Sequence, residues 1–337
     1  MLDLLIIGAG PCGLAVAACA QRSGLDYLAL DKGCIVDSLT RYPTNMTFFS
    51  TSDRLAIAGI PFITRRPNPT REEAMEYYRQ VAATLGLAVR TYERVVAVER
   101  EADGFRVIAR PVLKAGAVER VYQARALVVA TGSFDHPNRL GIPGEDSPKA
   151  SHYFTEAHRF YGQRVLVVGG RNSAVEAALE LYRAGAEVTL VHRGPTLSDR
   201  VKPWLLPFIH KRLEEGAIAS LFSSRLVEIG PESVIVETDG RRWELANDYV
   251  FILTGYRPDH SLLRSLGVEI DAATGAPRHD PETMETNVPG LYIAGVIAAG
   301  YDANAIFIEN GRFHGERIVG HLLERRRAGA ATGRAPS

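Results

Sequence analysis

Gly8-Ala9-Gly10-Pro11-Cys12-Gly13 is the stretch that decides the fold. It follows a continuously apolar run, Leu4 to Ile7, and precedes an alanine-rich segment, Leu14 to Arg22. An unbroken apolar run is typical of a strand buried on both faces, and the alanine-rich segment is predicted to be a helix. A returning strand is expected at Tyr27 to Leu30. The four segments together predict a βαβ unit that opens on a glycine turn.

The glycine turn has the chemistry of a dinucleotide site. Where such a turn opens a helix, backbone N–H groups and the helix dipole meet a pyrophosphate, and the missing side chains permit close approach. Gly8, Gly10 and Gly13 have the required spacing, and Asp31 ends the next strand, where a carboxylate can bind a ribose hydroxyl. The alternative is a tight turn in an ordinary α/β protein. The strand, the helix and the acid together favour the dinucleotide site.

The same pattern recurs in the second half of the chain. Arg164 to Val168 is a strand-like run, Gly169-Gly170-Arg171-Asn172-Ser173 is the turn, a helix is predicted through Arg183, and Glu187 to Val191 returns. An internal repeat of a supersecondary unit indicates two related domains. We therefore predict an α/β protein with two Rossmann-like dinucleotide-binding domains.

The second turn differs from the first. Arg171 stands where a middle glycine is usual, so its backbone can serve only if the side chain points outward. The ribose carboxylate is replaced by His192 and Arg193, with Arg200 and Lys202 downstream. Cations at this place match a 2′-phosphate and favour NADPH over NADH. The alternative is a solvated basic edge.

Two such sites, one with phosphate-matching cations and one without, indicate a bound FAD that is reduced by NADPH. Between the repeats we expect a helix at 71–85 and strands at 94–99 and 105–109, and strands ending in glycine turns at 127–132, 249–255 and 291–295. The Pro and Gly clusters at 136–144 and 277–289 are predicted to connect the domains. The second domain would then be inserted into the first, with the FAD domain at 1–150 and 285–325, the NADPH domain at 151–284, and a frayed tail at 326–337.

Composition points to small-molecule partners. Lysine plus arginine and aspartate plus glutamate number 39 each, so no net field favours nucleic acid or a membrane surface. We expect no membrane span and a cytoplasmic location. Cys12, Cys19 and Cys34 form neither a disulfide framework nor a metal-ligand pattern, and no metal is expected.

Five motifs carry a family resemblance. They are 8–13 (GAGPCG), 42–52 (YPTNMTFFSTS), 131–137 (TGSFDHP), 254–259 (TGYRPD) and 294–315 (AGVIAAGYDANAIFIENGRFHG). Taken together they resemble the bacillithiol-disulfide reductases, also called bacilliredoxin reductases, within the thioredoxin-reductase-like class of flavoproteins. In the wider class an aspartate usually follows the last glycine and binds the flavin ribityl chain, but Val296 stands there in this chain. That departure is shared with the bacillithiol family.

The resemblance implies an NADPH-dependent flavoprotein that reduces a low-molecular-weight disulfide such as bacillithiol disulfide, with a bacilliredoxin-type protein as a candidate thiol partner. A homo-oligomer is also expected. From the motifs and the resemblance together, the expected cofactor-binding residues are Gly8, Gly10, Pro11, Cys12, Gly13, Asp31, Lys32, Ser38, Leu39, Tyr42, Thr47, Val95, Ala130, Thr131, Gly132, Gly169, Arg171, Asn172, Ser173, His192, Arg193, Lys202, Thr254, Gly255, Gly295, Val296, Ala305 and Ile306.

Cys12 is the candidate catalytic residue. It begins the predicted helix beside the expected flavin pyrophosphate, where the helix dipole lowers a thiol pKa and the phosphates oppose this, so the net direction stays open. As a nucleophile it would attack the disulfide and form a mixed disulfide. The alternative is a cysteine that only fills space beside FAD. The resemblance favours catalysis.

Other readings of the same motifs stay open. A flavin-dependent monooxygenase has a comparable pair of loops but hydroxylates or S-oxidises its substrate, and a redox sensor binds both nucleotides without turnover. His136, His152, His210 and His314 are candidate acids or bases, since histidine titrates near neutrality. For His314, a hydrogen-bonded structural role is favoured.

Overall fold

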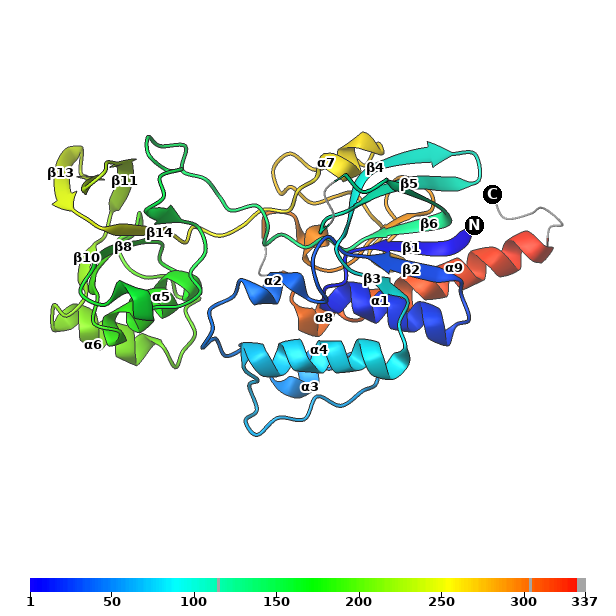
Figure 1. The fold of residues 1–337 in the computed structure, drawn as a ribbon, viewed down its shortest axis with the longest axis horizontal. Helices are drawn as coiled ribbons and strands as arrows, with labels where there is room; N and C mark the ends of the chain where they lie inside the picture. The colour runs from blue at the N-terminus through cyan, green and yellow to red at the C-terminus, as the bar shows by residue number, and fades with distance from the viewer. Residues whose placement is uncertain (114–115, 303–304, 332–337) are drawn as a thin grey trace. The chain divides into compact units, whose positions relative to one another are not determined.

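The structure is a computed structural model that describes residues 1–113, 116–302 and 305–331. The chain folds into two compact units (Figure 1). The first comprises residues 1–40, 50–136 and 256–337, and the second comprises 41–49 and 137–255.

The first unit is built on a mixed sheet. Its strand order in the described residues is β3-β2-β1-β6-β5-β4, and β15 pairs with β6. β1, β2, β3 and the C-terminal half of β6 run parallel, whereas β4 and β5 join in antiparallel pairs. The strands are β1 (Leu2–Ile7), β2 (Tyr27–Leu30), β3 (Val89–Arg90), β4 (Glu93–Glu101), β5 (Gly104–Pro111), β6 (Arg120–Val129) and β15 (Leu291–Ile293).

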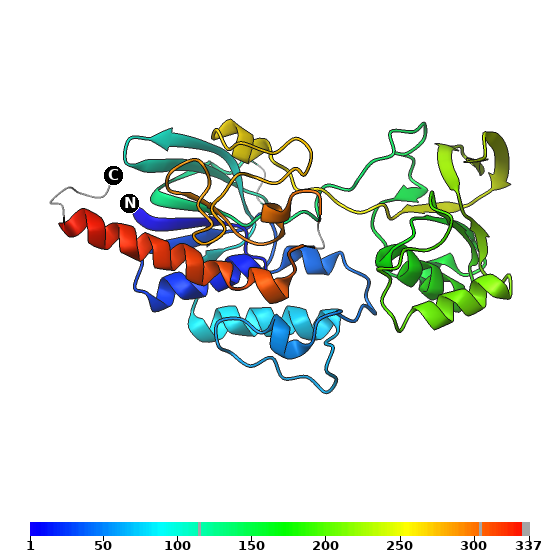
Figure 2. The ribbon, with the colours of Figure 1, turned by 180° about the vertical axis from the view of Figure 1, so that it is seen from behind.

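Helices cover this sheet, and two of them lie close together. The helices of the unit are α1 (Pro11–Arg22), α2 (Asp37–Thr40), α3 (Ser52–Leu55), α4 (Arg71–Leu85), α7 (Ser261–Ser265), α8 (Ile308–Gly311) and α9 (His314–Ala331). Figure 2 shows α9 running alongside α1. Pro11 at the first turn of α1 suits a helix start, because its fixed φ is already helical. Because β1, α1 and β2 follow one another and β1 pairs with β2 in parallel, the predicted βαβ unit is confirmed.

α4 shows how local sequence sets helix ends. Thr70 accepts a hydrogen bond from the backbone of Glu73, and the Glu73 side chain accepts one from the Thr70 N–H, which completes a capping box. Gly86 ends the helix in the left-handed region, with φ 59°. The helix expected near residues 71 to 85 is confirmed, and it spans Arg71–Leu85.

The second unit has the predicted second βαβ unit at its centre. Its parallel sheet has the order β10-β9-β8-β14-β7, and a second sheet, β11-β12-β13, is antiparallel. The elements are β7 (Ala150–Ser151), β8 (Arg164–Val168), α5 (Asn172–Arg183), β9 (Glu187–Val191), α6 (Leu206–Glu214), β10 (Ala219–Leu221), β11 (Ser224–Ile229), β12 (Ser233–Thr238), β13 (Arg241–Ala246) and β14 (Tyr249–Ile252), with a 3₁₀ turn at His158–Phe160.

Insertion of one unit into the other is confirmed, and the C-terminal strand β15 completes the first sheet as expected. The boundaries differ from the expected ones at 150 and 284. Residues 137–149 belong to the second unit because Leu140 and Ile142 pack on its core. Residues 256–284 belong to the first unit, where Leu263 and Val268 are buried in the core, so the cluster at 277–289 is not a connection between units.

Two further expectations are corrected. Tyr42 and Thr47 lie in the second unit, not the first. The segment from 326 is not frayed along its length, because α9 continues to Ala331 and Arg326 bonds Asp3. The rest of the expected tail, residues 332–337, lies outside the described residues.

Candidate active site

The glycine turn lies at the edge of the first sheet where three parallel strands end. Ile7 pairs with Val129, and Val129 pairs with Ile293, so the residues after β1, β6 and β15 are neighbours. Ligands of open α/β sheets bind at this carboxyl edge. The predicted residues Gly8, Ala130 and Gly295 are thereby brought together.

Close backbone packing requires glycine at positions 8 and 13. Gly8 has φ 116°, and a Cβ on it would lie 2.4 Å from the Ala130 carbonyl oxygen. A Cβ on Gly13 would lie 2.0 Å from the Gly8 carbonyl oxygen. Both distances are far below van der Waals contact, so the start of α1 can approach the sheet only with glycine at these positions.

Gly10 leaves open space and has no such constraint. A Cβ on it would meet no heavy atom within 4 Å, and its φ of −71° is accessible to any residue. As the N-cap of α1 it has no side-chain hydrogen bond that would satisfy the first N–H groups of the helix. The open space over uncapped N–H groups fits the pyrophosphate of a dinucleotide.

Asp31 holds this turn in place. One carboxylate oxygen accepts from the Ala9 N–H at 2.7 Å, and the other accepts from the Gly33 N–H at 2.8 Å. Burial raises the pKa of Asp31, and the two backbone donors oppose that rise. Next to it, the Lys32 ammonium pairs with Asp135 at 2.5 Å, which ties the predicted 131–137 motif to the end of β2.

The Cys12 thiol lies in a socket, which we define as the space between Gly295 and Gly311. A Cβ on Gly295 would lie 3.1 Å from Cys12 Sγ, and a Cβ on Gly311 would lie 2.9 Å from it. The predicted residue Ile306 also borders Gly311, since a Cβ on that glycine would lie 3.2 Å from Ile306 Cγ2. The two glycines thus give the thiol its room.

Burial decides the protonation of Cys12. Cys12 keeps part of its surface accessible, but its surroundings raise the pKa of the thiol to about 12. The direction that the sequence leaves open is therefore upward in this structure, because burial disfavours the charged thiolate. Cys12 is a neutral thiol at neutral pH in this structure.

His314 holds the Gly295 side of the socket. The buried Gly295 N–H donates to His314 Nδ1 at 3.1 Å, and only 5% of the His314 surface is exposed. Burial, together with the charges of Arg317 and His279, lowers the pKa of His314 to about 4. The ring is consequently neutral near pH 7, with Nδ1 as an acceptor. The hydrogen bond from the Gly295 N–H supports the structural role that the sequence favours for His314.

This pKa shift predicts a pH dependence of stability. A histidine whose pKa falls from 6.5 to about 4 on folding stabilises the protein fully above pH 6.5, and that stability is lost as pH falls from 6.5 toward 4. The loss at the acid end is up to about 3 kcal/mol for such a shift. His314→Asn should flatten the urea-derived stability curve over this interval by a comparable amount. An unchanged difference between pH 7 and pH 4.5 would contradict the assignment.

The second glycine turn is also set by close packing. Gly169 has φ 148°, and a Cβ on it would lie 2.6 Å from the Leu253 carbonyl oxygen. A Cβ on Gly170 would lie 2.5 Å from the His192 ring, so the imidazole packs directly on the turn. Burial, Arg193 and Arg171 lower the pKa of His192. Arg171 and Arg193 are exposed, which leaves the Arg171 backbone available as the sequence requires.

Lys202, which the cation pattern places near the 2′-phosphate, instead pairs with groups of the protein. Only 6% of its surface is exposed, and its ammonium contacts Glu176 at 2.5 Å and the Thr47 carbonyl oxygen at 3.1 Å. Its backbone N–H donates to Asn172, which begins α5. The charge of Lys202 is thus balanced inside the second unit. Arg193 and Arg200 are the exposed cations beyond β9.

The other predicted residues occupy several elements. Thr254 donates a hydrogen bond from its hydroxyl to the Asn138 carbonyl, and Gly255 follows it at the edge of the second unit.

Gly311 is absent from the expected site residues, and only its place in the 294–315 motif points to it. The remaining positions are Ser38 and Leu39 in α2, Val95 in β4, Thr131 and Gly132 after β6, Ser173 in α5, Val296 in a 3₁₀ turn (Val296–Ala299), and Ala305 before α8.

Neither a metal site nor a membrane span is found among the described residues. Within 1–113, 116–302 and 305–331, no group of three or more His, Cys, Asp or Glu side chains is arranged to hold a metal ion. In the same part of the chain, no helix is long and apolar enough to cross a membrane.

Comparisons with known proteins agree with this geometry. Residues 5–295 match the family model described as pyridine nucleotide-disulphide oxidoreductase. The chain is 44% identical over 322 residues to the bacilliredoxin reductase of Bacillus subtilis, covering 95% of this chain and 97% of the relative.

Solved structures give the same picture. The bacillithiol disulfide reductase of Bacillus cereus superposes with a TM-score of 0.93 at 43% identity, covering 96% of this chain and 99% of that one. The Staphylococcus aureus enzyme gives 0.91 at 42% identity with the same coverage. A flavin-containing monooxygenase from Stenotrophomonas maltophilia, at 24% identity and a TM-score of 0.75, shares the fold alone.

Proposed function

This chain belongs to the bacilliredoxin reductases within the pyridine nucleotide-disulphide oxidoreductase family, and from that premise we propose that it reduces a low-molecular-weight disulfide with electrons from NADPH. The disulfide named for the solved relatives is bacillithiol disulfide, and we propose it as the substrate here. A bacilliredoxin-type thiol protein is the proposed macromolecular partner, and the cytoplasm is the proposed location. The balanced reaction converts NADPH, a proton and one disulfide into NADP⁺ and two thiols.

One observation carries this proposal: the Cys12 thiol belongs to the first turn of α1, the same turn whose uncapped N–H groups fit a flavin pyrophosphate. FAD, when bound, would supply two-electron chemistry between the nicotinamide and the disulfide. Gly8, Gly10 and Gly13 would admit its pyrophosphate, and Asp31 would position the turn and offer a carboxylate to the ribose.

In the proposed reaction the Cys12 thiolate attacks one sulfur of the substrate. A bond forms between Cys12 and that sulfur, the substrate S–S bond breaks, and the other half leaves as a thiolate that takes up a proton to become the first thiol. Two electrons and a proton then cleave the mixed disulfide and release the second thiol. Because Cys12 is neutral in this structure, the attack requires an event that lowers its pKa.

A comparison of electron acceptors tests the proposed function. NADPH oxidation by the purified flavoprotein is measured with bacillithiol disulfide, with glutathione disulfide and with oxygen alone. We expect turnover with bacillithiol disulfide to exceed the other two by at least about tenfold, which corresponds to about 1.4 kcal/mol of discrimination. Failure with every disulfide and rapid peroxide formation would instead indicate an oxidase or a monooxygenase.

The exposed cations of the second unit predict the coenzyme preference. Arg193→Ala should raise the KM for NADPH about tenfold or more, the effect of losing one hydrogen bond to a charged group, and leave the KM for NADH nearly unchanged. Lys202→Met should instead lower thermal stability, since it leaves the half-buried Glu176 without its partner. Equal losses with both coenzymes in Arg193→Ala would rule out a 2′-phosphate contact.

A further inference from the structure

We propose that His314 is a positioning residue that holds the Gly295 turn against the Cys12 thiol. The expected effect on disulfide turnover rests on the proposed function, whereas the contacts among His314, Gly295 and Cys12 do not depend on it. It assigns to the first histidine of α9 a defined effect on a cysteine about three hundred residues earlier in the chain.

One face of α9 is bound to the segment that leads into the Gly295 turn. His314, His321 and Arg325 follow one another at spacings of seven and four, so they share a face of the helix. Each contacts the segment 285–295: His314 accepts from the Gly295 N–H, His321 Nδ1 lies 3.0 Å from the Tyr292 hydroxyl, and Arg325 pairs with Glu285 at 2.5 Å.

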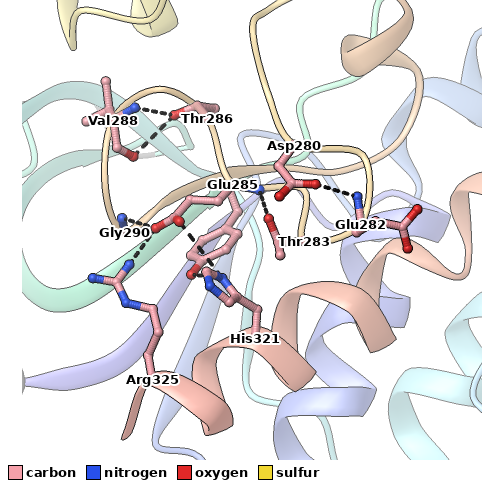
Figure 3. A network of polar contacts seen from close by, with 10 residues as sticks. Asp280, Glu282, Thr283, Glu285, Thr286, Val288, Gly290, His321 and Arg325 are labelled. Carbon is pink, nitrogen blue, oxygen red and sulfur yellow. Dashed lines mark hydrogen bonds and ion pairs between the residues drawn. The ribbon is translucent and has the colours of Figure 1, made fainter. Parts of the chain in front are cut away.

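The distal contacts fix the segment as far as β15. Glu285 also accepts from the Gly290 N–H at 2.7 Å, and Thr286 closes the intervening turn by bonding the Val288 backbone (Figure 3). Beyond β15 the Ala294 N–H still donates to the Val129 carbonyl. Sheet pairing ends there, and the next N–H, that of Gly295, turns to His314.

The Gly295 turn therefore depends on this histidine. Gly295 has φ 80°, in the left-handed region, and its N–H is buried. A buried N–H without an acceptor is costly, so removal of Nδ1 favours displacement of the turn. Because Gly295 forms one wall of the Cys12 socket, its displacement changes the surroundings of the thiol.

The position of His314 relative to Cys12 is itself fixed by close packing. A Cβ on Gly315 would lie 2.8 Å from the Ala15 carbonyl oxygen, so the start of α9 approaches the backbone of α1 at this point. Cys12 is in the first turn of α1, three residues before Ala15. The close contact between the starts of α1 and α9 thus fixes the position of His314 Nδ1 relative to the Cys12 thiol.

The charged groups facing His314 are compatible with an acceptor at Nδ1. Burial disfavours protonation of the ring, as do the charges of Arg317 on α9 and of His279 in the segment before β15. The imidazole therefore remains neutral at and around neutral pH, where disulfide turnover is measured.

His321 supplies a matched control, because it is on the same helix face and contacts the same segment but not the socket. We compare His314→Phe, which keeps a ring without an acceptor, with His314→Asn, whose side-chain oxygen can replace Nδ1, and with His321→Phe. His314→Leu serves as a second variant if His314→Phe does not fold. The readouts are disulfide turnover, anaerobic flavin reduction by NADPH, and iodoacetamide labelling of Cys12 and Cys19 by mass spectrometry.

In His314→Phe we expect labelling of Cys12 to rise and disulfide turnover to fall, each by about tenfold. Flavin reduction by NADPH, measured at matched FAD content, should fall by much less than disulfide turnover, because that step does not use the thiol. Labelling of Cys19, which is buried in the core of the first unit, should also be unchanged. His314→Asn should restore both properties, and His321→Phe should resemble the wild type.

Two results would overturn the inference: wild-type labelling of Cys12 in His314→Phe, or equal effects of His314→Phe and His321→Phe. Increased labelling of Cys19 would show general destabilisation and would also count against a positioning role. If the wild type reduces no disulfide, the proposed function fails, while the labelling comparison still decides the role of His314.

Discussion

Cys12→Ala is expected to lower disulfide turnover by a factor on the order of 1,000 or more, because loss of a nucleophile removes the covalent route entirely. The flavin should still be reduced by NADPH at the wild-type rate, since the glycine turn, Asp31 and the second unit are unchanged. Stopped-flow bleaching of the flavin measures the first step, and release of thiol measures the second.

The chain provides controls for this experiment. Cys19→Ala and Cys34→Ala remove the other two thiols, neither of which borders the socket of Gly295 and Gly311, and both should turn over disulfide normally. Cys12→Ser keeps the size of the side chain but removes the sulfur, so it should be as inactive as Cys12→Ala. Turnover by Cys12→Ala within a few-fold of the wild type would leave the residue as packing beside the flavin.

Gly10→Ala should lose FAD without losing the fold. A methyl group there meets no protein atom within 4 Å, and the backbone conformation suits alanine. It would instead occupy the open space over the start of α1, where the pyrophosphate is proposed to lie. We expect at least about a hundredfold weaker FAD binding, equivalent to losing about two hydrogen bonds to a charged group. Fluorescence titration of the apoprotein measures this.

Gly13→Ala is the matched comparison because its methyl group would meet the protein backbone. The 2.0 Å approach to the Gly8 carbonyl forces α1 away from the sheet, so the apoprotein itself should be destabilised by several kcal/mol. Thermal melts of the two apoproteins should therefore differ clearly. An equal loss of stability in Gly10→Ala would contradict an open cradle, and undiminished FAD binding by Gly10→Ala would place the pyrophosphate elsewhere.

The glycine turns can be predicted from sequence because their requirements are local. A strand, a turn that needs glycine and a helix follow one another within a few residues, and each leaves its own pattern. The helix at 71–85 is equally accessible, since its cap residues Thr70 and Glu73 are three positions apart. The resemblance carried by the five motifs then identifies the family, which the comparisons bear out.

What cannot be predicted depends on residues distant in the chain. The raised pKa of Cys12 results from burial beside Gly295 and Gly311, and no local pattern reports that contact. Lys202 follows a basic stretch, yet its partner Glu176 lies on the preceding helix α5. The expected boundary near 284 is wrong because proline and glycine at 277–289 suggest a connection, whereas core packing of 256–284 decides the unit.

In the proposed reaction an electron pair passes from NADPH through FAD to a disulfide. An anaerobic titration tests it most directly. One equivalent of NADPH should bleach the yellow flavin, and one equivalent of bacillithiol disulfide should restore the colour and yield two thiols per NADPH consumed. A flavin that is bleached by NADPH but regains its colour only when oxygen is admitted, with no thiol released, would contradict the account.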